Sequence, residues 1–278
     1  YYGTDQFAVQ TDLLKSKYLF SFLKKNAPDI ESSMREYYVA IISRIYLENF
    51  KVIAKMVYKR MDPISTMNEM IVPIIQKQSF FSTKQTLSNS TLFFELGENR
   101  HRLLHDILSP PQPFGDDTHY PVEALVRSLY QTLIDTITAE IAFSKEFFED
   151  PNIGMPIFSS TSRFMEGFIT DLVNKINDPV TMVLFYRFSC AHKKEMNARK
   201  ISLLDVHFNS IQQKVTSRFR TLLSSNRNVV DNCSTDLFVG PVQSSSHLAN
   251  IMTKRFAEFA LSIAIVNDDN TDDLTRQE

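Results

Sequence analysis

Cysteine and glycine are scarce in this sequence, and proline is limited. The 278 residues include 2 cysteines, 6 glycines and 11 prolines. Two cysteines are too few for a disulfide framework, and they favour a reducing, intracellular setting. An all-β chain needs a turn every ~8–12 residues, and this supply of glycine and proline is small for that purpose. The composition therefore favours helices over sheets.

A strong net charge and a long apolar run are also missing. The formal net charge is -2 at pH 7, so the charge balance favours neither nucleic acid nor a bulk anionic membrane as a partner. No apolar run approaches the ~18 residues that a membrane-spanning helix requires. The chain opens at Tyr1 without a methionine and without a signal peptide. We expect it to be a fragment of a longer protein.

The usual signatures of catalysis and cofactor binding do not occur. The glycines are isolated, so there is no phosphate-binding loop, and neither a GxSxG elbow nor an HExxH pair is present. His101 and His105 are four residues apart and would share a helix face, but no third metal ligand accompanies them. On a helix, Cys190 and His192 point about 200° apart, which is poor geometry for a nucleophile and its base. We predict no catalytic residue, no metal, no cofactor and no small-molecule substrate.

Apolar residues do follow the helical period through most of the chain. The expected helices cover residues 11–26, 29–61, 121–149, 160–177, 179–197, 201–225 and 247–266. The second is a long rod with Asp29 as its N-cap. Its apolar positions are spaced by three, four or seven residues, which predicts one packing stripe. These positions are Met34, Tyr38, Ile41, Ile45, Val52 and Met56.

A proline-rich stretch divides the chain. Residues 109–118, SPPQPFGDDT, combine three prolines, a glycine and two acids, which is typical of a linker. The sequence therefore predicts an N-terminal helical bundle over 1–112 and a C-terminal helical bundle with an acidic tail over 119–278. An irregular or short β insert is expected near 80–97. The predicted fold class is all-α, an elongated rod of stacked antiparallel bundles.

The helix expected from Pro121 is amphipathic. Apolar side chains form two adjacent rows along it, and the opposite row begins with Glu123, Arg127 and Gln131. Glu123 and Arg127 are four residues apart, in the order that favours a weak surface ion pair. We interpret this segment as a core helix that carries no chemistry.

The same segment carries a resemblance to a known family. Tyr120-Pro121-x-Glu123-Ala124-Leu125-x-Arg127-Ser128 resembles a motif in the C-terminal helical region of the vacuolar protein sorting-associated protein 52 family. Further similar pieces follow in the same order: LLKSKYLFSFL (13–23), REYYVAIISRIYLENF (35–50), Phe80-Phe81-Ser82, Phe94-x-Leu96-Gly97-x-x-Arg100, Glu146-Phe147-Phe148 and KRFAEFALSIAIVN (254–267). Residues 98–119 and 226–247 match poorly, so the geometry of those loops stays open.

The resemblance implies a function without catalysis. Members of that family are subunits of the Golgi-associated retrograde protein complex, a vesicle tether. The chain would then help capture endosome-derived carriers on the cytosolic face of the trans-Golgi network and endosomes, with a Golgi Rab GTPase, SNARE proteins and other tether subunits as partners. The family's coiled coil, which is thought to drive assembly, is not present in this sequence. Within the resemblance, Tyr120, Pro121, Glu123 and Arg127 form a structural motif at the joint between the two halves.

Three basic residues on the second predicted helix are the candidate partner-binding site. Arg44, Lys51 and Lys55 lie on one side of it, interrupted by Glu48, and could face an acidic partner or acidic lipid headgroups. A solvated helix face is the simpler reading of the same pattern. The alternative function is a helical metal-dependent hydrolase with a site between the bundles.

Overall fold

The computed structural model describes residues 3–62, 94–111, 118–232 and 252–266. Within these ranges the chain is all-α, as the sequence predicts, and contains no strand. The helices are α1 (Gly3–Lys15), α2 (Lys17–Asn26), α3 (Pro28–Arg60), α4 (Gly97–His105), α5 (Val122–Phe147), the 3-10 helix η1 (Pro151–Ile153), α6 (Gly154–Lys175), α7 (Pro179–Ala198) and α8 (Asp205–Asp231). Residues 252–266 form a further helix.

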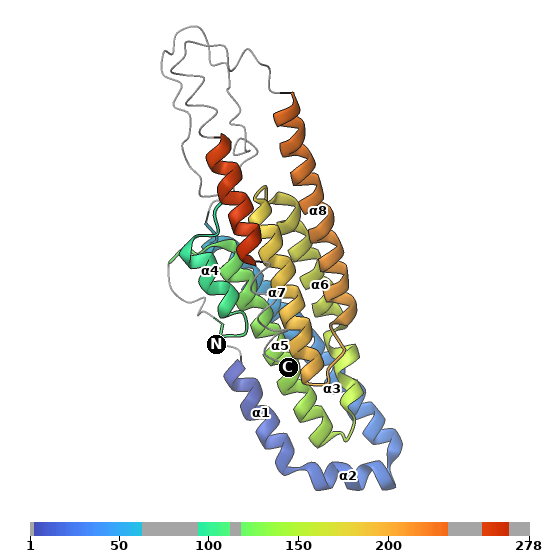
Figure 1. Cartoon of the computed structure of the whole chain (residues 1–278). Helices are drawn as coiled ribbons and strands as arrows, with labels where there is room; N and C mark the ends of the chain where they lie inside the picture. The colour runs from blue at the N-terminus through green and yellow to red at the C-terminus, as the bar shows by residue number, and fades with distance from the viewer. Residues whose placement is uncertain (1–2, 63–93, 112–117, 233–251, 267–278) are drawn as a thin grey trace, which may run out of the picture.

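The longest helices run alongside one another. In Figure 1, α5 to α8 follow the long axis of the molecule with α3 behind them, and α2 lies across one end. The closest packing joins α3 to α6 and α7 to α8. Stacking of several such bundles into a longer rod stays a prediction.

The first predicted helix is in fact two helices. We expected one helix over 11–26, but α1 starts at Gly3 and ends at Lys15, and α2 begins at Lys17. The break at Ser16 turns the chain so that α2 crosses the end of the bundle and buries Phe20. The Phe20 ring lies 4.8 Å from Phe147 and 5.1 Å from Phe148, between ring centroids. Burial of these aromatic side chains accounts for the change of direction.

The long helix α3 matches its predicted span, but its N-cap does not. Ala27 takes the cap position and Pro28 the first helical position, so the prediction of Asp29 as N-cap is wrong. Proline suits that position because its missing N–H would have no helical partner there. Asp29 instead lies in the first turn, where the negative charge of a carboxylate stabilises the helix by interacting with its dipole.

Other helix boundaries also differ from the prediction, and α8 begins at Asp205 rather than at 201. α6 begins at Gly154 rather than at 160, because η1 leads straight into it. α8 extends to Asp231, six residues beyond the predicted end. The helix α4 was not predicted as a separate element, because the spacing of apolar residues in its region is irregular. Residues 80–93 of the predicted insert near 80–97 lie outside the described residues. Its last residue, Gly97, is the first residue of α4.

α5 forms the centre of the core and is buried on more sides than predicted. Glu123, Arg127 and Gln131, which we placed on an outer polar row, are all buried. The reason is that α4 and α7 both pack against this part of α5. The residue pattern of one helix does not reveal that other helices pack against its polar side.

Residues from both sides of the 109–118 linker share this core. Tyr46 and Phe50 of α3 belong to the same cluster as Leu129 and Leu133 of α5. Whether 1–112 and 119–278 can each fold alone stays a prediction, which separate expression of the two segments would test.

Replacing Leu129 by aspartate is expected to unfold the C-terminal half of the chain. Leu129 has 0% of its surface exposed. A carboxylate at that position would be buried without a cation, at a cost of several kcal/mol. Circular-dichroism melting measures the effect, and Val206→Asp, at an exposed position of α8, is the control. A melt of Leu129→Asp that overlays the wild-type curve would contradict the packing described for α5.

Candidate functional site

The three basic candidates share the outer face of α3. Lys51 follows Arg44 by seven residues and precedes Lys55 by four, so the three side chains project from one side of the helix. Arg44 and Lys55 are exposed and Lys51 is half-buried. We call Arg44, Lys51 and Lys55 the basic row.

Glu48 lies within the basic row and is coupled to all three cations. Its Oε1 accepts a hydrogen bond from Lys51 Nζ at 2.8 Å. This bond and the Lys51 charge lower the pKa of Glu48, and the charges of Arg44 and Lys55 lower it further. One carboxylate among three cations leaves the row with an excess of positive charge.

An apolar row runs beside the basic row, where the sequence had predicted the packing stripe. Its members are Met34, Ile41, Ile45, Val52 and Met56. Their exposed fractions range from 39% to 46%. Tyr38 of the predicted stripe does pack against the core, but the prediction was wrong for the other five positions, because α3 carries apolar residues on two sides. The inward residues are Ile42, Tyr46, Phe50, Ala54 and Val57. Spacing reveals both rows, but it does not tell which one faces the core.

The inner side of α3 is held firmly against α6. Tyr46 stacks on Phe158 with 4.8 Å between ring centroids, and Tyr58 meets Phe168 edge to face at 5.1 Å. The Tyr58 hydroxyl also donates to the Asp171 carboxylate. These contacts fix the rotation of α3, so the basic and apolar rows keep one orientation toward solvent.

A buried carboxylate attaches α1 and α3 to α5. Glu140 accepts hydrogen bonds from Gln10 Nε2 at 2.8 Å and from the hydroxyls of Tyr38 and Tyr46, both at 2.7 Å. Burial and the neighbouring Glu140 charge raise the pKa of Tyr38, so its hydroxyl stays protonated as a donor. This cluster was not predicted from the sequence.

The backbone and acidic members of the predicted motif contact α3, α4 and α7. Tyr120 N donates to Arg60 O at 2.9 Å, and Pro121 is the N-cap of α5. Glu123 Oε1 lies 2.9 Å from the Arg100 guanidinium and accepts from Thr181 Oγ1 at 2.6 Å. The expected surface pair of Glu123 with Arg127 is wrong, because Arg100 of α4 occupies the place next to Glu123.

Arg127 makes most of its hydrogen bonds with main-chain carbonyls instead. Its Nη1 donates to Asp106 O at 2.9 Å and to Ser109 O at 3.0 Å. Burial lowers the pKa of Arg127, but a guanidinium remains charged at neutral pH. The side chain thus ties the segment after α4 to α5.

A second buried group joins α4, α5 and α7. Asp178 caps α7 by accepting from Val180 N at 2.8 Å, and it also receives the Arg100 guanidinium. Burial raises the pKa of Asp178 to about 6, and the Glu123 charge adds to this, while Arg100 opposes it. Two buried carboxylates therefore depend on one guanidinium.

The histidines do not gather into a candidate metal site in the described part of the chain. His101 and His105 lie side by side on α4, with 4.7 Å between ring centroids. Among the described residues no group of three or more His, Cys, Asp or Glu side chains could hold a metal ion. His192 is buried, and its ring donates to Phe188 O at 2.8 Å.

Two buried histidines predict that acid destabilises the fold. Burial lowers the pKa of His192 and of His207 from 6.5 to about 4. Between pH 6.5 and 4 the unfolded chain therefore binds protons at both histidines that the folded chain excludes. Asp178, with its raised pKa, has the opposite effect between 3.8 and about 6, but it is one group against two.

We thus expect the free energy of unfolding to fall as pH drops from 6.5 to 4, by about 1.4 kcal/mol per pH unit for one net proton. Urea melts at pH 7.5, 5.5 and 4.5 measure this slope. His207→Asn should flatten the slope, and an unchanged slope in that variant would show that His207 is not the cause.

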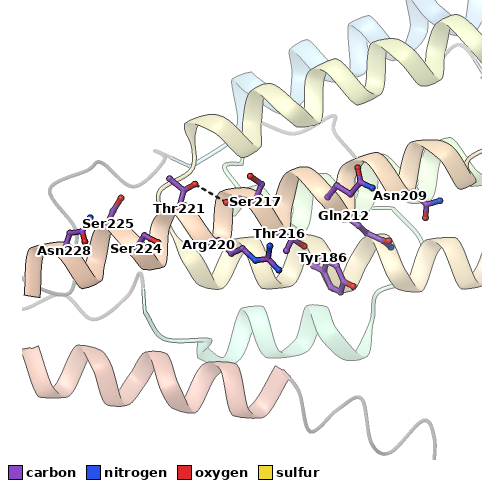
Figure 2. A pocket seen from close by; sticks show the side chains of 11 residues that line it. Tyr186, Asn209, Gln212, Thr216, Ser217, Arg220, Thr221, Ser224, Ser225 and Asn228 are labelled. Atoms are coloured by element: carbon purple, nitrogen blue, oxygen red, sulfur yellow. Dashed lines mark hydrogen bonds between the residues drawn. The ribbon is translucent and has the colours of Figure 1, made fainter. Parts of the chain in front are cut away.

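A polar groove runs along α8 beside α7. Figure 2 shows its lining, which includes Tyr186 of α7 and a series of amide and hydroxyl side chains of α8. Arg220 is the charged residue of this lining. The groove can donate and accept hydrogen bonds, but these side chains do not include a carboxylate or histidine for acid–base chemistry.

Across the described residues, no helix has both the length and the apolar character needed to cross a bilayer.

These features define an all-α scaffold in which the outer face of α3 combines exposed apolar and basic side chains. The family model described as Vps52, C-terminal matches residues 41–278 of the chain. The chain belongs to the Vps52 family, and it corresponds to the C-terminal region of its members.

Relatives from plants and mammals align with nearly the whole chain. Vacuolar protein sorting-associated protein 52 A of Arabidopsis thaliana is 25% identical over 267 residues, which cover 94% of this chain and 37% of the relative. The Vacuolar protein sorting-associated protein 52 homolog of Homo sapiens is 24% identical over 285 residues, which cover 96% of this chain and 38% of the relative. This chain thus spans well under half the length of these relatives. No solved structure shows a significant match.

Proposed function

We propose that this chain is part of a non-enzymatic subunit of a Golgi-associated retrograde vesicle-tethering complex. In this role it helps capture endosome-derived carriers at the cytosolic face of the trans-Golgi network and endosomes. Its partners are a Golgi Rab GTPase, SNARE proteins and the other subunits of the tether. Membership of the Vps52 family over residues 41–278 is the observation that carries the proposal.

The proposed mechanism depends on non-covalent contacts and on the length of the subunit, and no covalent bond is made or broken. A tether combines several weak contacts, and together these hold a vesicle much more tightly than any one of them. The basic row of α3 supports the proposal, because Arg44 and Lys55 form no ion pair among the described residues and Lys51 pairs with an acid of the same helix. Charges of this kind speed the encounter with an acidic partner and select against basic ones.

We further propose that the motif Tyr120, Pro121, Glu123 and Arg127 keeps the two predicted halves of the chain together. Three contacts support this proposal. The backbone of Tyr120 is hydrogen-bonded to the end of α3, Glu123 forms an ion pair with Arg100 of α4, and Arg127 is hydrogen-bonded to the segment after α4. A fixed relation between α3 and the α5–α8 helices would let one partner contact both.

Binding to Rab GTPases tests the function. The chain is immobilised, and a panel of Golgi and endosomal Rab GTPases is passed over it, each loaded with GTP or GDP. We expect saturable binding of one GTP form. The triple variant Arg44→Glu, Lys51→Glu, Lys55→Glu should weaken that binding by at least about tenfold.

The control carries the same change of charge on other faces. Lys145, Arg163 and Lys194 are exposed on α5, α6 and α7, and their replacement by glutamate should leave binding within about twofold. Absence of binding by every Rab in both nucleotide states would contradict a Rab contact in this region. It would leave SNAREs and the other tether subunits as the remaining partners.

A further inference from the structure

The apolar row of α3 has a repeat that suits contact with another helix. Met34, Ile45 and Met56 are separated by 11 residues each, and Ile41 and Val52 are separated by 11 as well. Eleven residues make just over three turns, so such a row stays nearly parallel to the helix axis. From Met34 to Met56 it extends for about 33 Å at 1.5 Å per residue. The row is therefore long and straight.

The basic row borders the apolar row on one side along its middle and C-terminal parts. At 100° per residue, the average directions of the two rows differ by about 90° around α3. Glu48 is the acid between them, and its carboxylate is bound by Lys51. An occupant of the apolar row thus meets positive charge along one flank.

We infer that the outer face of α3 binds an amphipathic α-helix of a partner protein, with apolar residues toward the apolar row and acidic residues beside the basic row. Helices recognise one another through rows of apolar side chains at helical spacing, and an 11-residue repeat is one such spacing. The charge of the basic row selects an acidic flank over a basic one. This inference deepens the proposed function and rests on it, because it names the kind of segment through which a tether partner would bind α3.

A second copy of this chain suits the surface less well. Glu48 is the acidic residue between the two rows on the outer face of α3, and its carboxylate is already hydrogen-bonded to Lys51. Two copies packed through their apolar rows would therefore provide no acidic partner for Arg44 and Lys55. In an antiparallel pair the two basic rows would also lie on the same side and repel each other.

A designed peptide tests the inference without knowledge of the natural partner. The probe is a fluorescent helical peptide of about 22 residues, with leucines at the positions of an 11-residue repeat and glutamates on one flank. A second peptide has lysines in place of the glutamates, and a third has the acidic composition in scrambled order. Fluorescence anisotropy measures their binding to the full chain.

The acidic amphipathic peptide should bind saturably, and the lysine and scrambled peptides should bind at least about tenfold more weakly. Ile45→Asp should abolish binding. Because a charge at that half-exposed position could disturb folding, Ile45→Ser serves as a second variant, and circular dichroism checks both. Met155→Ser and Val206→Asp, at exposed apolar positions elsewhere, should bind like the wild type.

Three results would overturn the inference. One is equal binding of the acidic and scrambled peptides, or no binding of either. Another is self-association of the chain in sedimentation velocity that Ile45→Ser removes, which would assign the face to a second copy. The third is cosedimentation with phosphatidylserine vesicles that depends on Ile45, which would assign it to a membrane. Rab binding that persists when the peptide fails would leave the proposed function standing.

Discussion

Replacing Glu140 by alanine is expected to lower the free energy of unfolding by about 3 kcal/mol, one of the largest effects of a single change in this chain. Gln10, Tyr38 and Tyr46 all donate hydrogen bonds to its carboxylate. Alanine would leave these donors in the interior without that acceptor, and each such loss costs on the order of 1–3 kcal/mol. Relief of the desolvation of a buried carboxylate offsets part of this cost.

Two variants separate the hydrogen bonds from the charge. Glu140→Gln keeps one acceptor oxygen and removes the charge, so it should lose clearly less stability than Glu140→Ala. Tyr46→Phe removes one donor together with its need for an acceptor, and we expect a loss of only about 1 kcal/mol. Urea unfolding at pH 7.5 measures all three. If Glu140→Ala unfolded at the wild-type urea concentration, the carboxylate would not hold α1 and α3 to α5.

Replacing Arg100 by methionine is expected to cost about 3–5 kcal/mol at pH 7.5, because it removes the cation from a buried ion pair. Glu123 and Asp178 would then lie near each other as buried carboxylates, with only the single hydroxyl proton of Thr181 to share between them. Arg102→Met is the matched control, since Arg102 is a neighbour on α4 whose ion pair with Glu98 is exposed. That change should cost less than about 1 kcal/mol.

The cost of Arg100→Met should shrink in acid. The pKa of Asp178 is about 6 even with Arg100 present, against 3.8 for an ordinary aspartate. Removal of the guanidinium raises it further, so the folded variant keeps a proton that the unfolded chain has released. A group with a raised pKa of this kind gains stability as pH falls through that pKa. We therefore expect the difference between variant and wild type to be smaller at pH 5 than at pH 7.5.

A difference that stayed constant with pH would contradict this account of Asp178. A wild-type melt for Arg100→Met would contradict the role proposed for the motif that contains Glu123. The first outcome concerns the protonation of Asp178, and the second concerns the packing of α4 against α5 and α7.

The sequence predicted most helices because their signals are local. Pro28 and Pro179 mark the starts of α3 and α7, and each start was placed within one residue. The break at Ser16 could not be predicted in this way, since it depends on where Phe20 meets the rings of Phe147 and Phe148. Local propensity carries no information about a contact across more than a hundred residues of chain.

The exposure of the basic candidates on α3 agrees with the sequence analysis, and their binding to a partner stays a prediction. The pattern of Arg44, Lys51 and Lys55 identified the exposed side of α3 for the charges, but the apolar row beside them was assigned to the interior. Both apolar rows of α3 have helical spacing, and the choice between them depends on how α6 packs. The misassigned row is the one that we propose as the contact for a partner helix.

The buried clusters left a signal that went unused. Glu140 follows Ile137 by three residues on the side of α5 that is otherwise apolar, so an acid occurs where the period calls for a core residue. Such an exception indicates a satisfied polar cluster or a functional site. Its donors could not be identified from sequence, since Gln10 and Tyr46 lie about 90 or more residues away.

Protection of α3 in the assembled complex tests the central claim most directly. The native cysteines are replaced by serine in the full-length protein, and Val52→Cys is introduced in the apolar row, with Val206→Cys as the exposed control. Maleimide labelling is then followed for the free subunit, for the purified tethering complex, and for the complex with GTP-loaded Rab. We predict that labelling at position 52 slows at least about tenfold in an assembled state while position 206 is unchanged. Equal labelling at position 52 in all three states would show that the outer face of α3 is not a contact surface.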